Sequence, residues 1–317
     1  MTSYIHTKLT MKLTVAVIII ATFVIAFHHA PQATAQTDET QDEAFAFQHN
    51  LDPSLPDEWI EEFGLIMANL DALIPIPSEI YELEHFKSPM PIYAWNSAVS
   101  NPFPQIPGAE GASISGNGTD SWMVLEIRED EFVYGDLHRY SVIVHEYFHV
   151  YQSALSQDNA QPIWLWEGGA KTIEELYVQQ VYGESQFDYE LFPVYSAAVE
   201  TPERFEDYIE TDEYQNYNGS TFLVLALVKE LQTQGITEER AFEMVLKDFQ
   251  AAKADGTDWE TAFENVFSLS VTDFYASLGQ YPVVESQEDW VEGMLVDISA
   301  AIPSTTLALE DIFVAAD

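Results

Sequence analysis

The chain has 317 residues, no cysteine and a formal net charge of −42, from 53 acidic and 11 basic side chains. This charge argues against nucleic acid or an anionic membrane as a partner, because both carry negative charge themselves. Without cysteine the chain forms no disulfide and carries no thiol-linked lipid. Its stability therefore has to come from an apolar core or from a bound metal.

The first 35 residues are typical of an export signal rather than of a folded domain. Lys12 is followed by the apolar run 13–27 and then by ATA, which has the small-residue form of a signal-peptidase site. We expect a mature chain that begins at Gln36, is secreted or periplasmic, and keeps no stable membrane anchor. Two alternatives stay open. Met11 is a more usual signal-peptide start, and the run could persist as an uncleaved anchor, although it is short for the ~20 residues that span a bilayer.

Removal of this segment increases the charge imbalance. Lys8 and Lys12 are its only charged residues, so the mature chain carries a net charge of −44. Self-repulsion of this size destabilises the compact state unless salt screens it, which is the condition in which halophilic proteins work. An acidic exported protein from an ordinary marine organism is the alternative, and composition does not separate the two.

The mature chain begins with residues 36–50, which are polar and acidic without a period and predict a disordered leader. Residues 55–75 follow with apolar side chains at helical spacing. Pro56 and Asp57 are start signals for this predicted helix.

Two strands are predicted next, at 90–96 and 121–127, joined by a Pro- and Gly-rich loop at 101–120. From about residue 137 onward the patterns are almost all helical. The sequence therefore predicts an α+β fold, in which a small sheet packs on a helical layer that leads into a helical C-terminal part.

His145 and His149 lie four residues apart around Glu146, in the segment HEYFH, within an apolar stretch of helical period. A helix places residues i and i+4 on one face, at a separation that lets two imidazoles bind one tetrahedral ion. Glu146 then lies beside the ion, where it can take a proton from water. Composition predicts about 0.02 such patterns by chance, so a pair of unrelated core histidines is the weaker interpretation.

A catalytic zinc site needs a third protein ligand, with the fourth position left to water. Glu167 is the candidate, because it lies in WLWEGGA, residues 164–170, in a predicted helix that starts at Pro162. The alternative is that Glu167 is one of the many solvated acids of this chain.

HEYFH followed by WLWEGGA resembles the gluzincin metallopeptidases, the group of thermolysin and the zinc aminopeptidases. The resemblance implies a zincin-type catalytic fold with a Zn²⁺ cofactor, held by His145, His149 and Glu167, and it implies that Glu146 is the general base. Seventeen residues separate His149 from Glu167, one fewer than in the aminopeptidase pattern. The resemblance covers about residues 140–235.

The same resemblance nominates further residues. Glu174, seven residues after Glu167, matches an acid that in aminopeptidases could orient a ligand imidazole. Gluzincins also carry a tyrosine that donates to the oxyanion, and the segment 216–231 nominates Tyr217 for this role, with Tyr214 as the second candidate. Packing is the alternative role for these side chains.

Upstream of the HEYFH segment the resemblance is weaker. Zinc aminopeptidases hold the substrate amine with a glutamate in a G-x-M-E-N motif, for which this chain offers only Glu126 without the flanking residues. Specialised exopeptidase activity is therefore not expected. His138 is expected either at the cleft or at the helix start, and Lys171 in an ion pair on its helix face.

These observations divide the chain into four parts: a signal peptide (1–35), a disordered acidic leader (36–50), a zincin-like catalytic domain (51–235) and a helical C-terminal part packed on it (236–317). Residues 257–278 of the last part predict two short helices.

The functional hypothesis is a secreted zinc-dependent peptidase that acts on peptides or proteins. One alternative is a non-catalytic, metallopeptidase-like protein that binds zinc or serves as a scaffold. Another is an acidic surface protein with core histidines.

We expect the mature protein to be more stable in molar salt than at low ionic strength, because the Debye length shortens to about 3 Å at 1 M. Thermal melts of the mature chain in dilute buffer and in molar NaCl measure this difference. A melting temperature that does not rise with salt would contradict the halophilic interpretation and leave the metal-site hypothesis untouched.

Overall fold

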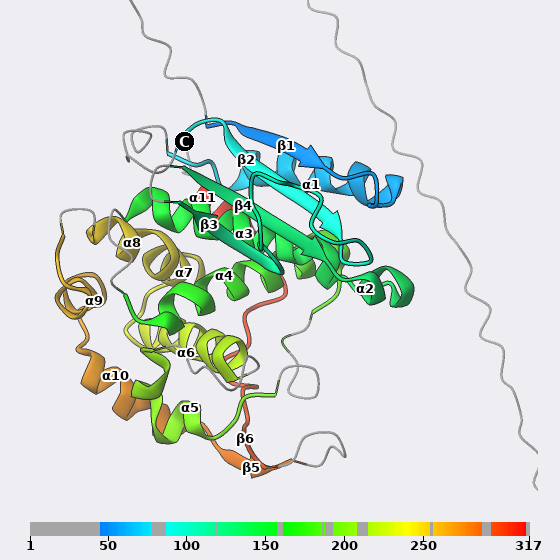
Figure 1. The fold of residues 1–317 in the computed structure, drawn as a ribbon. Helices are drawn as coiled ribbons and strands as arrows, with labels where there is room; N and C mark the ends of the chain where they lie inside the picture. Colours follow the sequence, from blue (N-terminus) through cyan, green and yellow to red (C-terminus); the bar gives the residue numbers. More distant parts are fainter. Residues whose placement is uncertain are drawn as a thin grey trace, which may run out of the picture. The chain divides into compact units, whose positions relative to one another are not determined.

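The fold is α+β, as the sequence predicts: a four-stranded mixed sheet lies against a group of helices (Figure 1). The structure is a computed structural model, and the residues it describes belong to the compact unit Asp42–Asp317. They are 45–77, 87–117, 120–156, 161–185, 187, 193–207, 215–253, 256–286 and 293–314.

The sheet has the strand order β1-β2-β4-β3, in which β1, β2 and β4 are parallel and β3 runs antiparallel to β4 at one edge. Strands β2 and β4 confirm the two predicted strands. The strands are β1 (Phe47–Leu51), β2 (Met90–Asn96), β3 (Ala112–Gly116) and β4 (Ser121–Ile127).

Two sequence predictions are wrong in part. The predicted leader 36–50 overlaps β1 at residues 47–50, and the predicted loop 101–120 contains β3. Both strands are short and lie at opposite edges of the sheet, where pairing with one neighbour through backbone groups leaves little periodicity in the side chains. Residues 36–44 of the leader lie outside the described residues.

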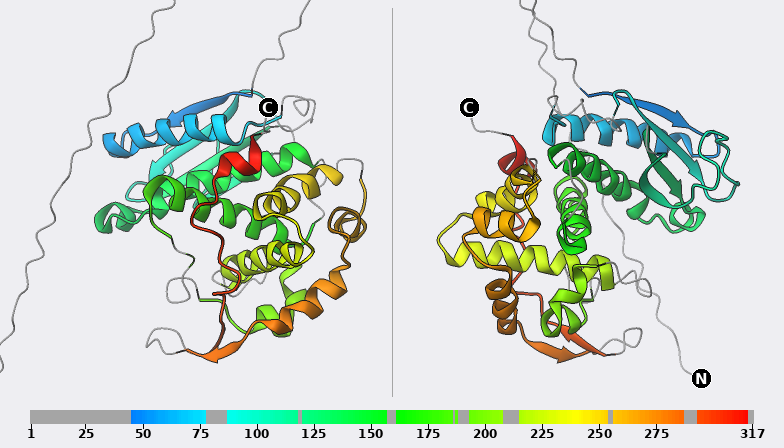
Figure 2. Two further views of the ribbon diagram at one scale, coloured as in Figure 1. Left: turned by 180° about the vertical axis from the view of Figure 1, so that it is seen from behind. Right: turned by 60° about the vertical axis from the view of Figure 1, so that its left-hand side comes forward.

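Three helices carry or support the site. They are α1 (Asp57–Leu73), α3 (His138–Leu155) and α4 (Ile163–Tyr177), and each corresponds to a predicted helix. Figure 2 shows α1 and α3 on one side of the sheet, and α3 contacts both β3 and β4. Helix α4 packs on α3 and on α6 (Ser220–Thr233).

The rest of the chain is mostly helical. Strands β5 (Val283–Glu285) and β6 (Met294–Val296) form an antiparallel hairpin that the sequence did not predict. Helices α9 (Trp259–Phe267) and α10 (Val271–Ser277) confirm the two short helices predicted within 257–278. The remaining elements are α2 (Glu129–Tyr134), η2 (Val178–Tyr182), α5 (Ala197–Glu200), η3 (Pro202–Phe205), η4 (Gln215–Gly219), α7 (Glu238–Glu243), η5 (Met244–Asp248), α8 (Phe249–Ala252), η6 (Leu278–Gln280) and α11 (Leu309–Phe313).

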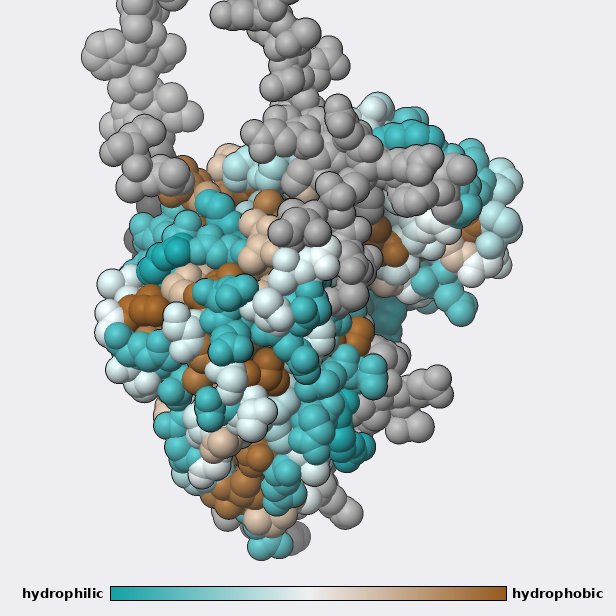
Figure 3. Space-filling model, turned by 90° about the vertical axis from the view of Figure 1, so that its left-hand side faces the viewer, coloured by the Kyte–Doolittle hydropathy of each residue, from teal (hydrophilic) through white to brown (hydrophobic). Residues whose placement is uncertain are grey.

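One apolar cluster extends through the described residues from Leu55 to Phe313, across the predicted boundary at 235. A smaller cluster around Trp95 and Val124 covers the other side of the sheet. The face drawn in Figure 3 carries hydrophilic residues interspersed with smaller apolar areas. No helix among the described residues is long and apolar enough to cross a membrane.

A close contact between α4 and α6 runs through Gly168. A Cβ atom on Gly168 would lie 2.4 Å from the backbone oxygen of Ser220 and 3.0 Å from the nitrogen of Thr221. Backbone atoms cannot rotate away as a side chain can, so only glycine permits this approach. The contact brings the first turn of α6 against the residue that follows Glu167.

We expect Gly168→Ala to lower the free energy of unfolding by about 1–3 kcal/mol, because the added methyl forces α4 and α6 apart. Chemical denaturation of wild type and variant measures the loss. Gly64→Ala is the matched control: Gly64 lies exposed on α1 with nothing within 4 Å of the new methyl, and this change should stabilise by about 0.4–1 kcal/mol. Equal effects of the two substitutions would show that the α4–α6 contact is not as tight as described.

Candidate metal centre

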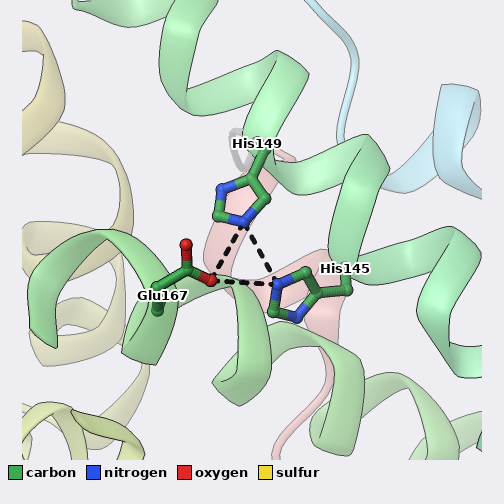
Figure 4. Close-up of side chains that lie close together, drawn as sticks. All are labelled: His145, His149 and Glu167. Atoms are coloured by element: carbon green, nitrogen blue, oxygen red, sulfur yellow. Dashed lines mark hydrogen bonds and ion pairs between the residues drawn. The ribbon is translucent and has the colours of Figure 1, made fainter. Parts of the chain in front are cut away.

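Helix α3 presents the two histidines as expected from their spacing. Both are buried, and their Nε2 atoms lie 3.1 Å apart (Figure 4). Their rings are nearly perpendicular, with centroids 4.7 Å apart. Two nitrogen atoms this close and this buried require a proton or a cation between them, since neither gains from facing a second lone pair.

Glu167 reaches the same point from α4, with its carboxylate turned toward both imidazoles (Figure 4). Its Oε2 atom lies 3.3 Å from His145 Nε2 and 3.3 Å from His149 Nε2. The three donor atoms thus form a nearly equilateral triangle. A tetrahedral ion with bonds of about 2.0–2.1 Å holds its ligand atoms about 3.3–3.4 Å apart. The triangle therefore has the dimensions of one face of such a coordination shell, and the group could bind a metal ion.

The ionisation of His145 and Glu167 depends on whether a proton or a metal ion lies between their donor atoms. Burial alone would lower the pKa of His145, but hydrogen bonds with Glu167 and Glu174 raise it to about 10. Burial alone would raise the pKa of Glu167, but its contacts with both histidines hold that pKa below its ordinary value. A proton and a metal ion therefore compete for the same donor atoms.

Glu174 lies behind His145, as its spacing from Glu167 predicts. Its Oε2 is 3.2 Å from His145 Nδ1, while its Oε1 accepts hydrogen bonds of 2.7 Å from Ser141 Oγ and from Lys171 Nζ. A carboxylate at Nδ1 leaves Nε2 of His145 as the atom that faces the triangle.

Lys171 forms the ion pair expected of it, but in the interior rather than on an open helix face. Its Nζ lies 2.7 Å from Glu174 and 2.7 Å from Glu175, both of which are buried. Two buried carboxylates next to one another are costly unless a cation lies between them. Lys171 therefore allows Glu174 to stay ionised, and the pKa of Glu174 is well below its ordinary value despite burial.

Glu146 lines a cleft of about 210 Å³ together with the triangle. Its Oε2 atom is buried and has no hydrogen-bond partner among the described residues. Burial raises its pKa. The cleft is lined by Ala112, Ser113, Ile114, His145, Glu146, His149, Trp166, Glu167 and Tyr217.

Tyr217, on η4, lines the same cleft, and its ring centroid is 5.8 Å from that of His145. The structure therefore brings the first tyrosine candidate to the site; Tyr214 lies outside the described residues. Glu126 is not among the residues that line the cleft, and its carboxylate accepts a hydrogen bond of 2.8 Å from the N–H of Gly111, directly before β3. His138 begins α3, pairs with Glu131 at 3.0 Å and is half exposed, so it occupies the helix start.

Sequence reasoning missed several residues of this site. Trp166 stacks on His149 with centroids 4.7 Å apart and an interplanar angle of 14°, and Gln152 Oε1 lies 2.8 Å from His149 Nδ1. Gln152 follows His149 by three residues and Trp166 precedes Glu167, so closeness in the sequence to the candidate ligands was the available signal. The β3 residues of the cleft carried no signal, because they lie far away in the sequence.

Comparisons of the chain with models of protein families, with curated proteins and with solved structures found no significant match.

We expect Glu167→Ala to lose zinc far more readily than Glu174→Ala. Loss of Glu167 removes a donor atom, whereas loss of Glu174 removes support for an imidazole, which typically costs ~10–100-fold in affinity. Competition titration with a chelator measures both affinities, and circular dichroism checks that both variants fold. A weaker zinc affinity in Glu174→Ala than in Glu167→Ala would contradict the assignment of the triangle.

Proposed function

We propose that the protein is an exported, zinc-dependent peptidase of the gluzincin type, which hydrolyses peptide bonds with Glu146 as general base. One observation carries the proposal: Glu146, whose buried Oε2 atom has no hydrogen-bond partner among the described residues, lines the same cleft as a His-His-Glu triangle of tetrahedral size. A purely structural metal site does not require an unpaired carboxylate beside an open cleft.

The donor set favours zinc as the ion. Two imidazole nitrogens and one carboxylate oxygen in tetrahedral spacing, with a fourth direction open to a cleft, are typical of catalytic zinc sites. Bound there, zinc would supply Lewis acidity, which makes water a better nucleophile at neutral pH and polarises a carbonyl group.

Glu146 would move the proton. Its carboxylate takes a proton from the attacking water as the oxygen of that water bonds to the scissile carbonyl carbon. The same carboxyl group then gives the proton to the amine nitrogen as the carbon–nitrogen bond breaks. Burial, which raises the pKa of Glu146, strengthens it as a base for this transfer.

Tyr217 would stabilise the charge that develops on the carbonyl oxygen. A neutral phenol donates a hydrogen bond to an oxyanion without adding a titrating group near neutral pH. Its position in the cleft, with its ring at 71° to that of His145, supports this role.

The edge strand β3 supports a peptide as the substrate. Ala112, Ser113 and Ile114 of β3 line the cleft, and within the described sheet β3 pairs only with β4. An extended peptide can pair with the backbone of an edge strand regardless of its sequence. Such pairing would place the peptide along the triangle and Glu146.

The proposal includes export and excludes nucleic acid as a partner. The apolar run and ATA segment at the N-terminus, and a mature charge of −44, support these two points. Peptides or proteins outside the cytoplasm are then the substrates.

We expect Glu146→Gln to keep zinc while hydrolysis falls by at least ~100-fold, the contribution typical of a general base. Glutamine is nearly isosteric and can still hydrogen-bond, so proton transfer is the main property lost. Metal content and turnover of a peptide library, measured on the same sample in low and molar salt, test this. In the same assay Tyr217→Phe should retain zinc and lower kcat by ~100-fold, with a smaller change in KM.

Glu243→Gln, which alters an ion pair on α7 with Arg240, is the matched control and should change neither quantity. Wild-type activity in Glu146→Gln would exclude Glu146 as the base. A wild-type protein that binds zinc but cleaves no peptide at either salt concentration would favour the non-catalytic zinc-binding or scaffold alternative.

A further inference from the structure

Gln152 connects the second histidine of the triangle with the helix that carries the third ligand. It lies on α3 and is only 1% exposed. Its Oε1 atom is 2.8 Å from His149 Nδ1, and its Nε2 donates to the backbone oxygen of Trp166 at 3.0 Å and, more weakly, to that of Leu165 at 3.4 Å.

The orientation of the Gln152 amide follows from these partners. The backbone oxygens of Leu165 and Trp166 only accept hydrogen bonds, so the NH₂ group has to face them. The carbonyl oxygen of the amide then faces His149, where it can only accept. His149 therefore carries its ring proton on Nδ1, and Nε2 keeps a free lone pair directed at the triangle.

The same side chain fixes the first turn of α4. Leu165 and Trp166 directly precede Glu167, so the two hydrogen bonds hold the turn from which the third ligand extends. Gly169 leaves room for this arrangement, since a Cβ there would lie 3.1 Å from Gln152 Nε2. Trp166 completes the enclosure of His149 by stacking on its ring.

The two imidazoles are thus held by different chemistry. His145 faces the carboxylate of Glu174, which forms an ion pair with Lys171, whereas His149 faces the neutral amide of Gln152. A neutral acceptor sets the tautomer of His149 without adding a fifth carboxylate to a region that already contains Glu146, Glu167, Glu174 and Glu175.

We propose that Gln152 is a positioning residue of the metal centre: it sets the tautomer of His149 and ties that imidazole to the turn of α4 that carries Glu167. This inference rests on metal binding by the triangle, which is part of the proposed function, and does not require peptidase activity.

Two variants separate the two effects of Gln152. Gln152→Leu removes both the acceptor and the donors at similar volume, and should weaken zinc binding by ~10–100-fold, the usual effect of losing the partner of a ligand imidazole. Gln152→Glu keeps the acceptor for His149 but turns a carboxylate toward the backbone oxygens of α4. It should bind zinc within about tenfold of wild type, although it should unfold at a lower temperature.

Zinc affinity is measured by chelator competition on the full mature chain, with Gln250→Leu as the matched control. Gln250 is equally buried and is hydrogen-bonded to Gln161 and to none of the three ligand residues, so this variant should bind zinc like wild type. Proton–nitrogen NMR of zinc-loaded, histidine-labelled protein provides a second readout. The Nδ1–H proton of His149 should be protected from exchange in wild type and in Gln152→Glu, and unprotected in Gln152→Leu.

Wild-type zinc affinity in Gln152→Leu, or a loss in Gln152→Glu as large as in Gln152→Leu, would overturn the inference. Should Gln152→Leu fail to fold, Gln152→Glu and the wild-type Nδ1–H resonance decide, and the absence of that resonance would also overturn it. Because zinc binding is measured apart from hydrolysis, a protein that binds zinc without cleaving peptides would reject only the peptidase proposal.

Discussion

The burial of α3 is the constraint on which the rest of the site depends. Every residue from 140 to 154 is buried, yet the helix carries Ser141, His145, Glu146, His149 and Gln152 in this stretch. Polar groups without water need partners inside the protein, or each costs several kcal/mol. Helix α4 supplies most of them, through Glu167, Glu174 and the backbone oxygens of its first turn. The contacts that satisfy the polar side of α3 are therefore the same contacts that assemble the His-His-Glu triangle.

The two glycines after Glu167 allow close contacts with two different helices. Gly168 faces the backbone of α6, which allows that helix and the preceding η4 to approach, and η4 carries Tyr217. Gly169 faces the amide of Gln152 on α3. Helix α4 is thereby held on two sides within one turn of Glu167. A side chain held in this way has little conformational freedom to lose on binding an ion, which would favour both affinity and a defined geometry.

The sheet contributes to the site mainly by supporting α3 and by placing the edge strand β3 at the cleft. Its parallel strands β1, β2 and β4 pack on α1 and α3 through apolar side chains, and the antiparallel edge strand β3 lies at the cleft.

The acidic character of the chain continues into the interior, where Glu174 and Glu175 both form ion pairs with Lys171. Breaking such a buried group by removing one partner typically costs about 3–5 kcal/mol. The ion pairs of Lys171 beside the triangle therefore contribute to the stability of the fold.

The sequence by itself determined the elements whose residues interact within one helix. The spacing of His145 and His149, the apolar pattern of α1 and the position of Glu167 after Pro162 are local properties, so these helices and the common face of the two histidines could be predicted. The tertiary structure alone decided which side chains from different elements meet. Strands β1 and β3 form through backbone pairing that leaves almost no side-chain pattern, and the contacts of Gln152 with α4 and of β3 with the cleft join segments that nothing in the sequence links. Periodicity records how a helix or strand faces its surroundings, but the partner on that face depends on how the whole chain packs.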